Sequence, residues 1–333
     1  MTVIAVAGGS GGVGRTLVER LVQEPKFQVI VLSRATSNGP SFPGAQTVQI
    51  NYDDISSMEK TLDHHNVHTI ISAIGLISDE TSQSQLNLID AAEKSTATKR
   101  FIPSEFSFIQ TPDLLSIDPS SKYWLDAANR LKESSLKYTR VVPGFFMDYW
   151  GMPHVPTNLL PYTFGINVAK HEAAIPGDGN DAICMTYTYD MANYVVKALD
   201  LDEWPEFSVI VGDEVTYNQL LRIAEETTGA KFKVTYDTFE QVNSGDVTIP
   251  PNPSGTDYPE DEMKEMTALI ESSALRARVN HSNAVGASSN EVGTPRVDIR
   301  VPAQKLLDGE GVLMLRDDVP ACISILDFVK QVA

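Results

Sequence analysis

The feature that most constrains this chain is a glycine-rich turn close to its amino terminus. Residues 6–17 read VAGGSGGVGRTL, with five glycines among seven consecutive positions. An apolar run over 2–7 precedes the turn, and Val13, Leu17 and Leu21 follow it at the spacing of one helix face. The order strand, glycine turn, helix is typical of the first unit of a dinucleotide-binding parallel sheet.

The glycine spacing predicts a phosphate-binding turn. Gly8, Gly11 and Gly14 follow the pattern G-x-x-G-x-x-G, which supplies a tight turn, close approach of a pyrophosphate, and packing of helix on strand. The unpaired N–H groups at the start of the helix would then bind the phosphates. An unliganded glycine turn is the alternative, and the legible strand and helix argue against it. The expected cofactor contacts in this turn are Gly8, Ser10, Gly11, Gly12, Val13 and Gly14.

The end of the second strand indicates which nucleotide binds. An NAD site places an acidic residue about 20 residues beyond the glycines, whereas an NADP site carries a basic residue there. This chain has no acidic residue between Glu24 and Asp53, and its second strand-like run ends in Ser33-Arg34. We therefore expect NADPH, with Arg34 near the extra phosphate; an ordinary surface arginine is the alternative interpretation of that residue.

Apolar runs and helical patterns alternate along the first 142 residues. Further strands are expected over 27–32, 67–74, 100–102 and 139–142, with helices over 56–63, 83–94 and 123–133. This rhythm predicts an α/β fold with a parallel sheet covered on both faces. Beyond Gly144 the alternation breaks. A loop or lid is expected over 151–165, helices over 190–199 and 217–227, a strand over 207–211, and loops over 243–259 and 280–295.

Composition excludes several other classes of protein. A net charge of −18 over 333 residues disfavours nucleic acid as a partner, and two cysteines are too few for a disulfide framework. No stretch is apolar enough to span a membrane, and no leader is evident, so we expect a cytoplasmic protein. The histidines at 64, 65 and 68 and the acidic residues at 257 and 260–262 are expected to be solvated, so no metal site is predicted.

Several motifs together resemble one protein family. They are GGSGGVGR at 8–15, SAIG at 72–75, KRFIPSEF at 99–106, YT at 138–139, GFF at 144–146 and IPGDGN at 175–180. In combination they are similar to the isoflavone reductase-like, NmrA-like branch of the atypical short-chain dehydrogenases. The similarity extends over about residues 1–230.

The resemblance implies a Rossmann-type doubly wound sheet with a smaller C-terminal α/β substrate domain. It places the dinucleotide-binding domain at 1–155, with return segments at about 170–212, and the substrate domain in the rest of 156–333. It also implies that the cofactor contacts include Ala73, Ile74, Gly75, Gln85, Pro103, Ser104, Glu105 and Phe106. The substrate pocket would begin at Phe145, Phe146 and Tyr149. For these aromatic residues core packing is an equal alternative, and His154 on the following loop is a candidate substrate contact.

The catalytic residues fit the family less well. None of the tyrosines has a lysine four residues later, so the Tyr-x-x-x-Lys pair of many short-chain reductases is absent. Reductases of the isoflavone branch carry a lysine early in the helix before Tyr138-Thr139, where this chain has Trp124. Lys122 is displaced by two residues, or roughly 200° around a helix. We take Lys122 as the candidate proton donor and Tyr123 as its reserve.

These observations predict an NADPH-dependent reductase. It would transfer hydride to a small aromatic, phenolic or related secondary-metabolite substrate in the cleft between the domains, as a monomer or homodimer. Two other functions remain open. One is an NmrA-like regulatory protein that senses the dinucleotide without turnover, and the other is a redox-neutral isomerase on the same fold.

Overall fold

A six-stranded parallel sheet forms the centre of the molecule. The computed structural model describes residues 1–34, 42–116, 118–253, 255–283 and 312–313. The strands lie in the order β3-β2-β1-β4-β5-β6, so the order reverses at β1 and β4. Their bounds are β1 (Thr2–Ala7), β2 (Phe27–Ser33), β3 (Ala45–Gln49), β4 (Val67–Ser72), β5 (Arg100–Ile102) and β6 (Lys137–Tyr138).

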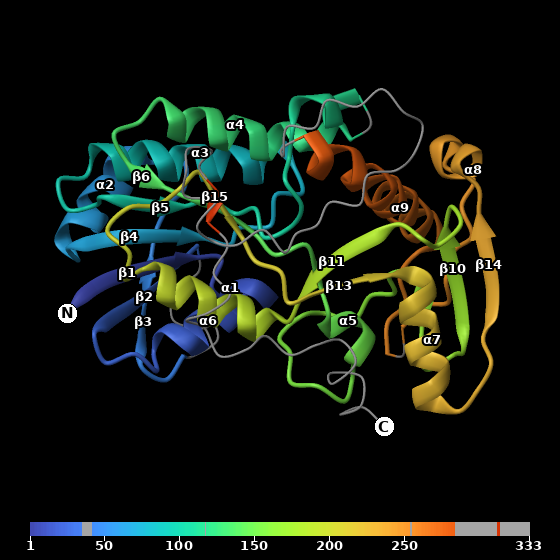
Figure 1. Cartoon of the computed structure of the whole chain (residues 1–333). Helices are drawn as coiled ribbons and strands as arrows, with labels where there is room; N and C mark the ends of the chain where they lie inside the picture. The colour runs from blue at the N-terminus through green and yellow to red at the C-terminus, as the bar shows by residue number, and fades with distance from the viewer. Residues whose placement is uncertain (35–41, 117, 254, 284–311, 314–333) are drawn as a thin grey trace.

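Helices cover both faces of this sheet, as Figure 1 shows. On one face α1 (Gly12–Leu21) packs against α6 (Thr188–Ala198), and the buried side chains there include Val6, Leu17 and Met191. The other face carries α2 (Ile55–His64), α3 (Asp79–Lys94) and α4 (Lys122–Lys132), which bury Ile70, Leu88 and Phe101. Near-continuous apolar strands with helices on both sides confirm the Rossmann-type doubly wound fold expected from the sequence.

The predicted strand over 139–142 is confirmed, and the separate short strand β6 precedes it. β6 pairs with β5, whereas β7 (Arg140–Val142) pairs in parallel with β12 (Phe207–Val209), which in turn pairs with β15 (Val312–Leu313). The break falls at the buried Thr139, whose hydroxyl lies 2.8 Å from that of Ser208. The chain therefore passes from one sheet to the next at this residue.

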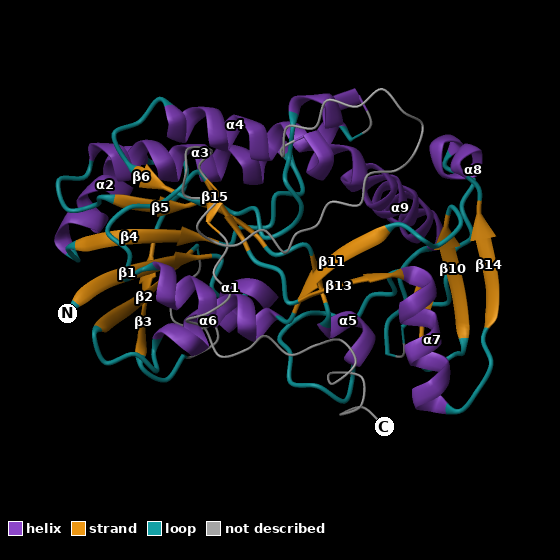
Figure 2. Cartoon of the chain, viewed as in Figure 1, coloured by secondary structure: helices purple, strands orange, loops and turns teal. Residues whose placement is uncertain are grey.

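Among the described residues beyond Gly144, two small sheets and four α-helices lie at the other end of the molecule (Figure 2). One sheet is formed by β8 (Phe145–Phe146), β11 (Ala182–Thr186) and β13 (Asp213–Thr216), and the other by β9 (Ile166–Asn167), β10 (Glu172–Pro176) and β14 (Lys233–Asp237). The helices are α5 (Asp148–Gly151), α7 (Tyr217–Thr228), α8 (Phe239–Ser244) and α9 (Glu260–Asn283). Of the expected return segments at 170–212, α6 and β12 lie with the large sheet, and β10 and β11 lie in the small sheets.

The sequence predictions after Gly144 are confirmed in part. α7 ends at Gly229, which takes the left-handed conformation (φ 67°) expected of a C-terminal glycine. α9 is not predicted by the sequence. Its first turn contains the acidic residues at 260–262, and negative charge suits the positive end of a helix. The end of α9 also replaces the first residues of the loop expected over 280–295, and the rest of that loop lies outside the described residues.

Candidate active site

The glycine turn between β1 and α1 leaves no space for side chains at two positions. Gly8 has a φ of 73°, and a Cβ atom there would lie 2.3 Å from the carbonyl oxygen of Ala73 after β4. A Cβ on Gly14 would lie 2.2 Å from the carbonyl oxygen of Gly8. The Gly11 amide donates to that same oxygen at 3.0 Å, which closes the turn. Glycine at these positions therefore allows β1, α1 and β4 to meet at the carboxyl edge of the sheet.

The N-terminus of α1 suits an anion. Gly11 is its N-cap in extended conformation, and no described side chain caps the helix or places a carboxylate in its first turn. The first N–H groups of a helix lack intrahelical partners, and the helix dipole adds partial positive charge there. Ser10 and Gly11 are exposed, and Gly12 and Val13 are half-buried, so the turn is accessible. Arg15 instead pairs with Glu19 at 3.0 Å, one turn along the helix.

The segment expected as a loop or lid lies beside the turn. The Asn158 side chain donates to Thr16 Oγ1 at 3.1 Å and to Glu19 Oε2 at 3.0 Å. Leu159 lies against Gly12, because a Cβ atom there would be 2.7 Å from Leu159 Cδ2. His154, at the start of this segment, is exposed. The segment is thus attached to α1 by side-chain hydrogen bonds.

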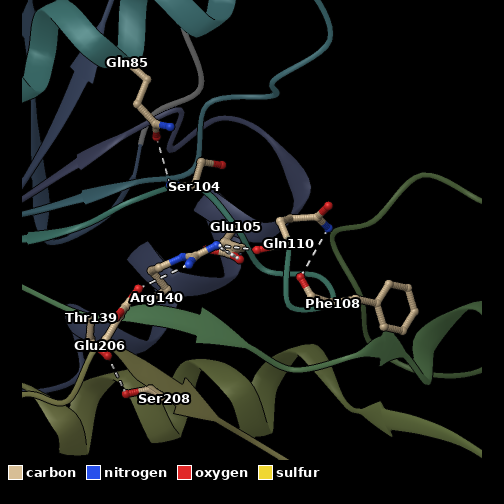
Figure 3. Close-up of polar contacts among 9 residues, drawn as sticks. All are labelled: Gln85, Ser104, Glu105, Phe108, Gln110, Thr139, Arg140, Glu206 and Ser208. Carbon is tan, nitrogen blue, oxygen red and sulfur yellow. Dashed lines mark hydrogen bonds and ion pairs between the residues drawn. The ribbon is translucent and has the colours of Figure 1, made fainter. Parts of the chain in front are cut away.

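A second group of predicted residues meets at the ends of β4 and β5 (Figure 3). The Ser104 amide donates to Gln85 Oε1 at 2.9 Å, and its hydroxyl donates to the Ile74 carbonyl oxygen at 2.8 Å. Gln85 Nε2 and Ser72 Oγ are buried, and neither has a hydrogen-bond partner among the described residues. Buried polar atoms are rarely left unpaired, so a polar group of a ligand fits here. Gly75 is exposed and has open space around it, whereas Pro103 is buried.

The glycine turn and the Gln85 amide together fit a dinucleotide. The turn offers N–H groups to a diphosphate, and the Gln85 amide, in the second turn of α3, offers a donor two strands away. Arg34 directly follows β2, on the side of the turn opposite to Gln85, and is exposed. Its carbonyl oxygen accepts a hydrogen bond from the Gln49 side chain, and residues 35–41 that follow lie outside the described part of the chain.

Glu105 and Phe106 are buried in the segment that follows β5. The Glu105 carboxylate accepts two hydrogen bonds from Arg140, at 2.6 and 2.8 Å. Burial raises the pKa of Glu105, and the Arg140 guanidinium opposes that rise. Phe106 has a φ of 41°, which is unusual for a residue with a bulky side chain. Both oxygens of Glu105 already accept hydrogen bonds from Arg140. A direct contact between Glu105 and the cofactor stays a prediction.

The aromatic residues expected to start the substrate pocket divide between two cores. Phe146 packs with the side chains under α1 and α6, and Phe145 packs with those of the small sheets. Phe145 contacts Phe108 with ring centroids 4.7 Å apart, and the half-buried Tyr149 contacts Phe164 at 4.4 Å. The sequence interpretation missed Phe108 and Phe164. Phe108 follows Phe106 at the spacing of alternate strand residues, which could have marked it, whereas no pattern marks Phe164.

The candidate proton donors lie on the surface between the first turns of α3 and α4. Lys122 Nζ pairs with Asp79 Oδ1 at 2.7 Å and lies 5.0 Å from the centre of the Tyr123 ring. The hydrogen bond to Asp79 raises the pKa of Lys122, and desolvation together with Asp79 raises that of Tyr123. Both groups therefore keep their protons at neutral pH, as a proton donor must.

Two negative findings apply to the described residues. None of their helices combines the length and apolarity needed to cross a bilayer. No three or more of their histidine, cysteine, aspartate and glutamate side chains gather where they could hold a metal ion.

The strand order, the glycine turn and the uncapped start of α1 define a Rossmann-type α/β protein. Sequence comparison identifies the family: the profile of the NmrA-like family matches residues 1–288, and this chain belongs to that family. The oxidoreductase swnN of Metarhizium robertsii is 32% identical over 276 residues, which cover 76% of this chain and 81% of the relative. The oxidoreductase BOA1 of Botryotinia fuckeliana is 37% identical over 235 residues, or 70% and 78%.

Plant reductases share the fold and confirm the resemblance found in the sequence. Pinoresinol reductase 2 of Arabidopsis thaliana is 25% identical over 254 residues, covering 71% of this chain and 77% of that protein. The structure of leucoanthocyanidin reductase from Vitis vinifera, a binary complex with NADPH, superposes with a TM-score of 0.67 at 16% identity. It covers 99% of this chain and 98% of the reductase. An isoflavone reductase structure gives 0.68 at 16% identity, with 100% and 99% coverage.

Proposed function

We propose that this protein is an NADPH-dependent reductase that acts on a small aromatic, phenolic or related secondary-metabolite substrate. The observation that carries the proposal is the glycine turn. Backbone oxygens leave no room for a Cβ atom at Gly8 or Gly14, and the helix that follows has no side-chain cap. Relatives named oxidoreductases support it, as does the solved complex of a reductase with NADPH.

Each part of the site has a proposed role. The amides of Gly11, Gly12 and Val13 bind the diphosphate, and Arg34 pairs with the 2′-phosphate. Gln85 and Ser104 orient the nicotinamide end. NADPH, when bound, supplies the hydride. The remaining proposed contacts are those that the sequence resemblance implies: Gly8, Ser10, Gly14, Ala73, Ile74, Gly75, Pro103, Glu105 and Phe106.

The substrate would pack on half-buried aromatic rings beyond the end of β5. Phe108, Tyr149 and Phe164 present such rings, and stacking on them favours a planar apolar substrate. Lys122 donates the proton to the oxygen on which negative charge develops, and Tyr123 is the second candidate. The buried Phe145 and Phe146 pack behind these rings. The exposed His154 is a further candidate contact of the substrate.

The test is consumption of NADPH in the presence of phenolic and quinone-like substrates, followed by the absorbance of the reduced nicotinamide. We expect turnover with NADPH, and Arg34→Asp should lower the preference for NADPH over NADH by about 100-fold. Lys26→Asp is the matched control, because Lys26 is an exposed cation at the opposite end of β2. Saturable NADPH binding without turnover on any substrate would instead favour the dinucleotide-sensing function. An isomerised product with no net NADPH consumption would favour the isomerase.

A further inference from the structure

Arg140, the first residue of β7, has a buried guanidinium that the proposed function does not use. Its side chain is 4% exposed, and that of its partner Glu105 is 2% exposed. Nε donates to Glu105 Oε2 at 2.6 Å and Nη2 donates to Oε1 at 2.8 Å, so the fork of the guanidinium meets both carboxylate oxygens. Figure 3 shows this pair between the end of β5 and the start of β7.

The same guanidinium contacts three further groups. Nη2 also donates to the carbonyl oxygen of Gln110 at 3.3 Å, and Nη1 lies 3.5 Å from Glu206 Oε1. The Phe207 ring lies under it, 4.5 Å from the guanidinium carbon to the ring centre. Arg140 therefore connects β12 with both ends of the segment Glu105–Gln110. A lysine could supply the charge but not this planar set of donors.

The segment from Ser104 to Gln110 contacts three parts of the proposed site. Ser104 contacts Gln85 at the nicotinamide side, and the Phe108 ring contacts the aromatic cluster through Phe145. The Gln110 side chain accepts from the Ser121 hydroxyl at 3.0 Å, and Ser121 is the N-cap of α4, which begins at Lys122.

Within this segment one described hydrogen bond links its own residues: the Gln110 side chain donates to the Phe108 carbonyl oxygen at 3.2 Å. Its described residues form no helix or strand, and Phe106 takes a positive φ that few non-glycine residues adopt. Such a conformation persists only where the surroundings determine it. Two backbone hydrogen bonds hold the middle of the segment, because the Phe106 amide donates to the Val141 carbonyl oxygen at 3.1 Å and the Ser107 carbonyl oxygen accepts from the Gly144 amide at 3.3 Å. Arg140 adds side-chain contacts at Glu105 and at the Gln110 carbonyl oxygen. A buried ion pair adds little net stability, so the geometry that this pair specifies is its more important contribution.

We propose that Arg140 is a positioning residue of the reductase site. Through Glu105 and the Gln110 carbonyl it holds the segment Ser104–Gln110, which sets the nicotinamide-side contacts of Ser104 relative to the aromatic cluster and the start of α4. This inference rests on the proposed function. It assigns no contact between Arg140 and the cofactor or substrate.

The test separates the two halves of the cofactor. Adenosine 2′,5′-bisphosphate carries the adenine, the 2′-phosphate and one 5′-phosphate but no nicotinamide, so it reports on the Arg34 and glycine-turn side of the site and not on the nicotinamide side. We expect Arg140→Lys to weaken NADPH binding by about tenfold and to leave the affinity for adenosine 2′,5′-bisphosphate within about twofold. A role confined to stability would change both affinities alike.

Arg130→Lys is the matched control. Arg130 lies on α4, is half-buried, and also pairs with two carboxylates, those of Asp90 and Glu93. It makes none of the contacts described for the segment Ser104–Gln110, so both affinities should stay within about twofold of the wild-type values.

A second variant keeps the test decisive if Arg140→Lys does not fold. In Glu105→Gln the guanidinium retains Glu206 as a counter-charge, and we expect NADPH binding to weaken about threefold with adenosine 2′,5′-bisphosphate unchanged. Equal losses for both nucleotides, or no loss for either, would overturn the inference while the proposed function stands. If the wild-type protein binds neither nucleotide, the proposed function fails and this inference fails with it.

Discussion

The glycine turn and the aromatic region that packs against α9, around Tyr162 and Phe164, are stabilised in different ways. At the turn, backbone atoms fill the available space, and the Gly8 carbonyl oxygen is paired. Beneath α9, aromatic rings pack around Phe164, and several buried polar atoms have no hydrogen-bond partner among the described residues. These atoms are Asn252 Oδ1 and both carboxylate oxygens of Glu271.

The difference separates a site fixed by the backbone from one fixed by side-chain packing. A turn that requires glycine tolerates almost no substitution, because any side chain there meets backbone atoms that cannot move independently. Packed rings and unpaired polar groups can change while the fold persists, which suits a region that selects among substrates. The predictions below test this comparison.

The largest effect is expected from Gly8→Ala. The new methyl group would lie 2.3 Å from the Ala73 carbonyl oxygen on a residue with a φ of 73°, so β1 and β4 must move apart. We expect a loss of about 3 kcal/mol or more in the free energy of unfolding, measured by chemical denaturation, and loss of NADPH binding.

Gly229→Ala is the control for this substitution. Gly229 has a similar φ of 67°, but a Cβ atom there meets no atom within 4 Å. It should cost about 1 kcal/mol through the backbone alone and leave NADPH binding unchanged. Equal losses in the two variants would show that crowding at the turn has no role.

The next effect concerns Glu271, which is buried in α9. Desolvation and the nearby Asp237 raise its pKa from 4.5 to about 8, so the folded protein holds a proton that the unfolded chain releases. Its contribution to stability is complete below pH 4.5 and is lost as the pH rises to about 8. Glu271→Gln should remove this dependence and stabilise the protein at pH 9 by about 2 kcal/mol.

Chemical denaturation at pH 5 and pH 9 measures this effect. Glu265→Gln is the control, because Glu265 lies on the exposed face of the same helix. The wild-type protein and the Glu271→Gln variant should differ in how their free energies of unfolding change with pH. The same pH dependence in both would contradict the claim that Glu271 is neutral in the folded protein.

A smaller effect is expected at the surface pair of Lys122 and Asp79. If Lys122 donates the proton, Lys122→Met should lower kcat by about tenfold or more without changing the melting temperature or the affinity for NADPH. Exposed Lys132 near the end of α4 provides the control substitution Lys132→Met. An unchanged kcat in Lys122→Met would transfer the role to Tyr123, which Tyr123→Phe would test.

The sequence predicted the region around the glycine turn in detail, because the conformation of this region depends on which residue types stand at a few neighbouring positions. Glycine at 8 and 14, apolar β1 and the helix spacing of Val13, Leu17 and Leu21 specify the βα unit locally. The break between β6 and β7 at Thr139 was not predictable, because it depends on the pairing of β7 with β12, nearly 70 residues later in the chain.

The substrate side was harder to predict because its contacts join distant segments. Phe108, Tyr149 and Phe164 meet only after β8 and the loop beyond it fold back on the segment following β5. Glu105 matched a family motif, yet the sequence alone did not reveal that Arg140 engages both of its oxygens. The sequence did not predict α9, because prolines precede this helix and the apolar residues of the helix show little helical periodicity.

The central claim is that the turn between β1 and α1 binds NADPH. Titration of the purified wild-type protein with NADPH, followed by calorimetry, tests it most directly. The account predicts one saturable site per chain with a Kd of about 10 µM or tighter, lost in Gly8→Ala and retained in Gly229→Ala. No heat of binding with NADPH or NADH from a folded wild-type protein would contradict it.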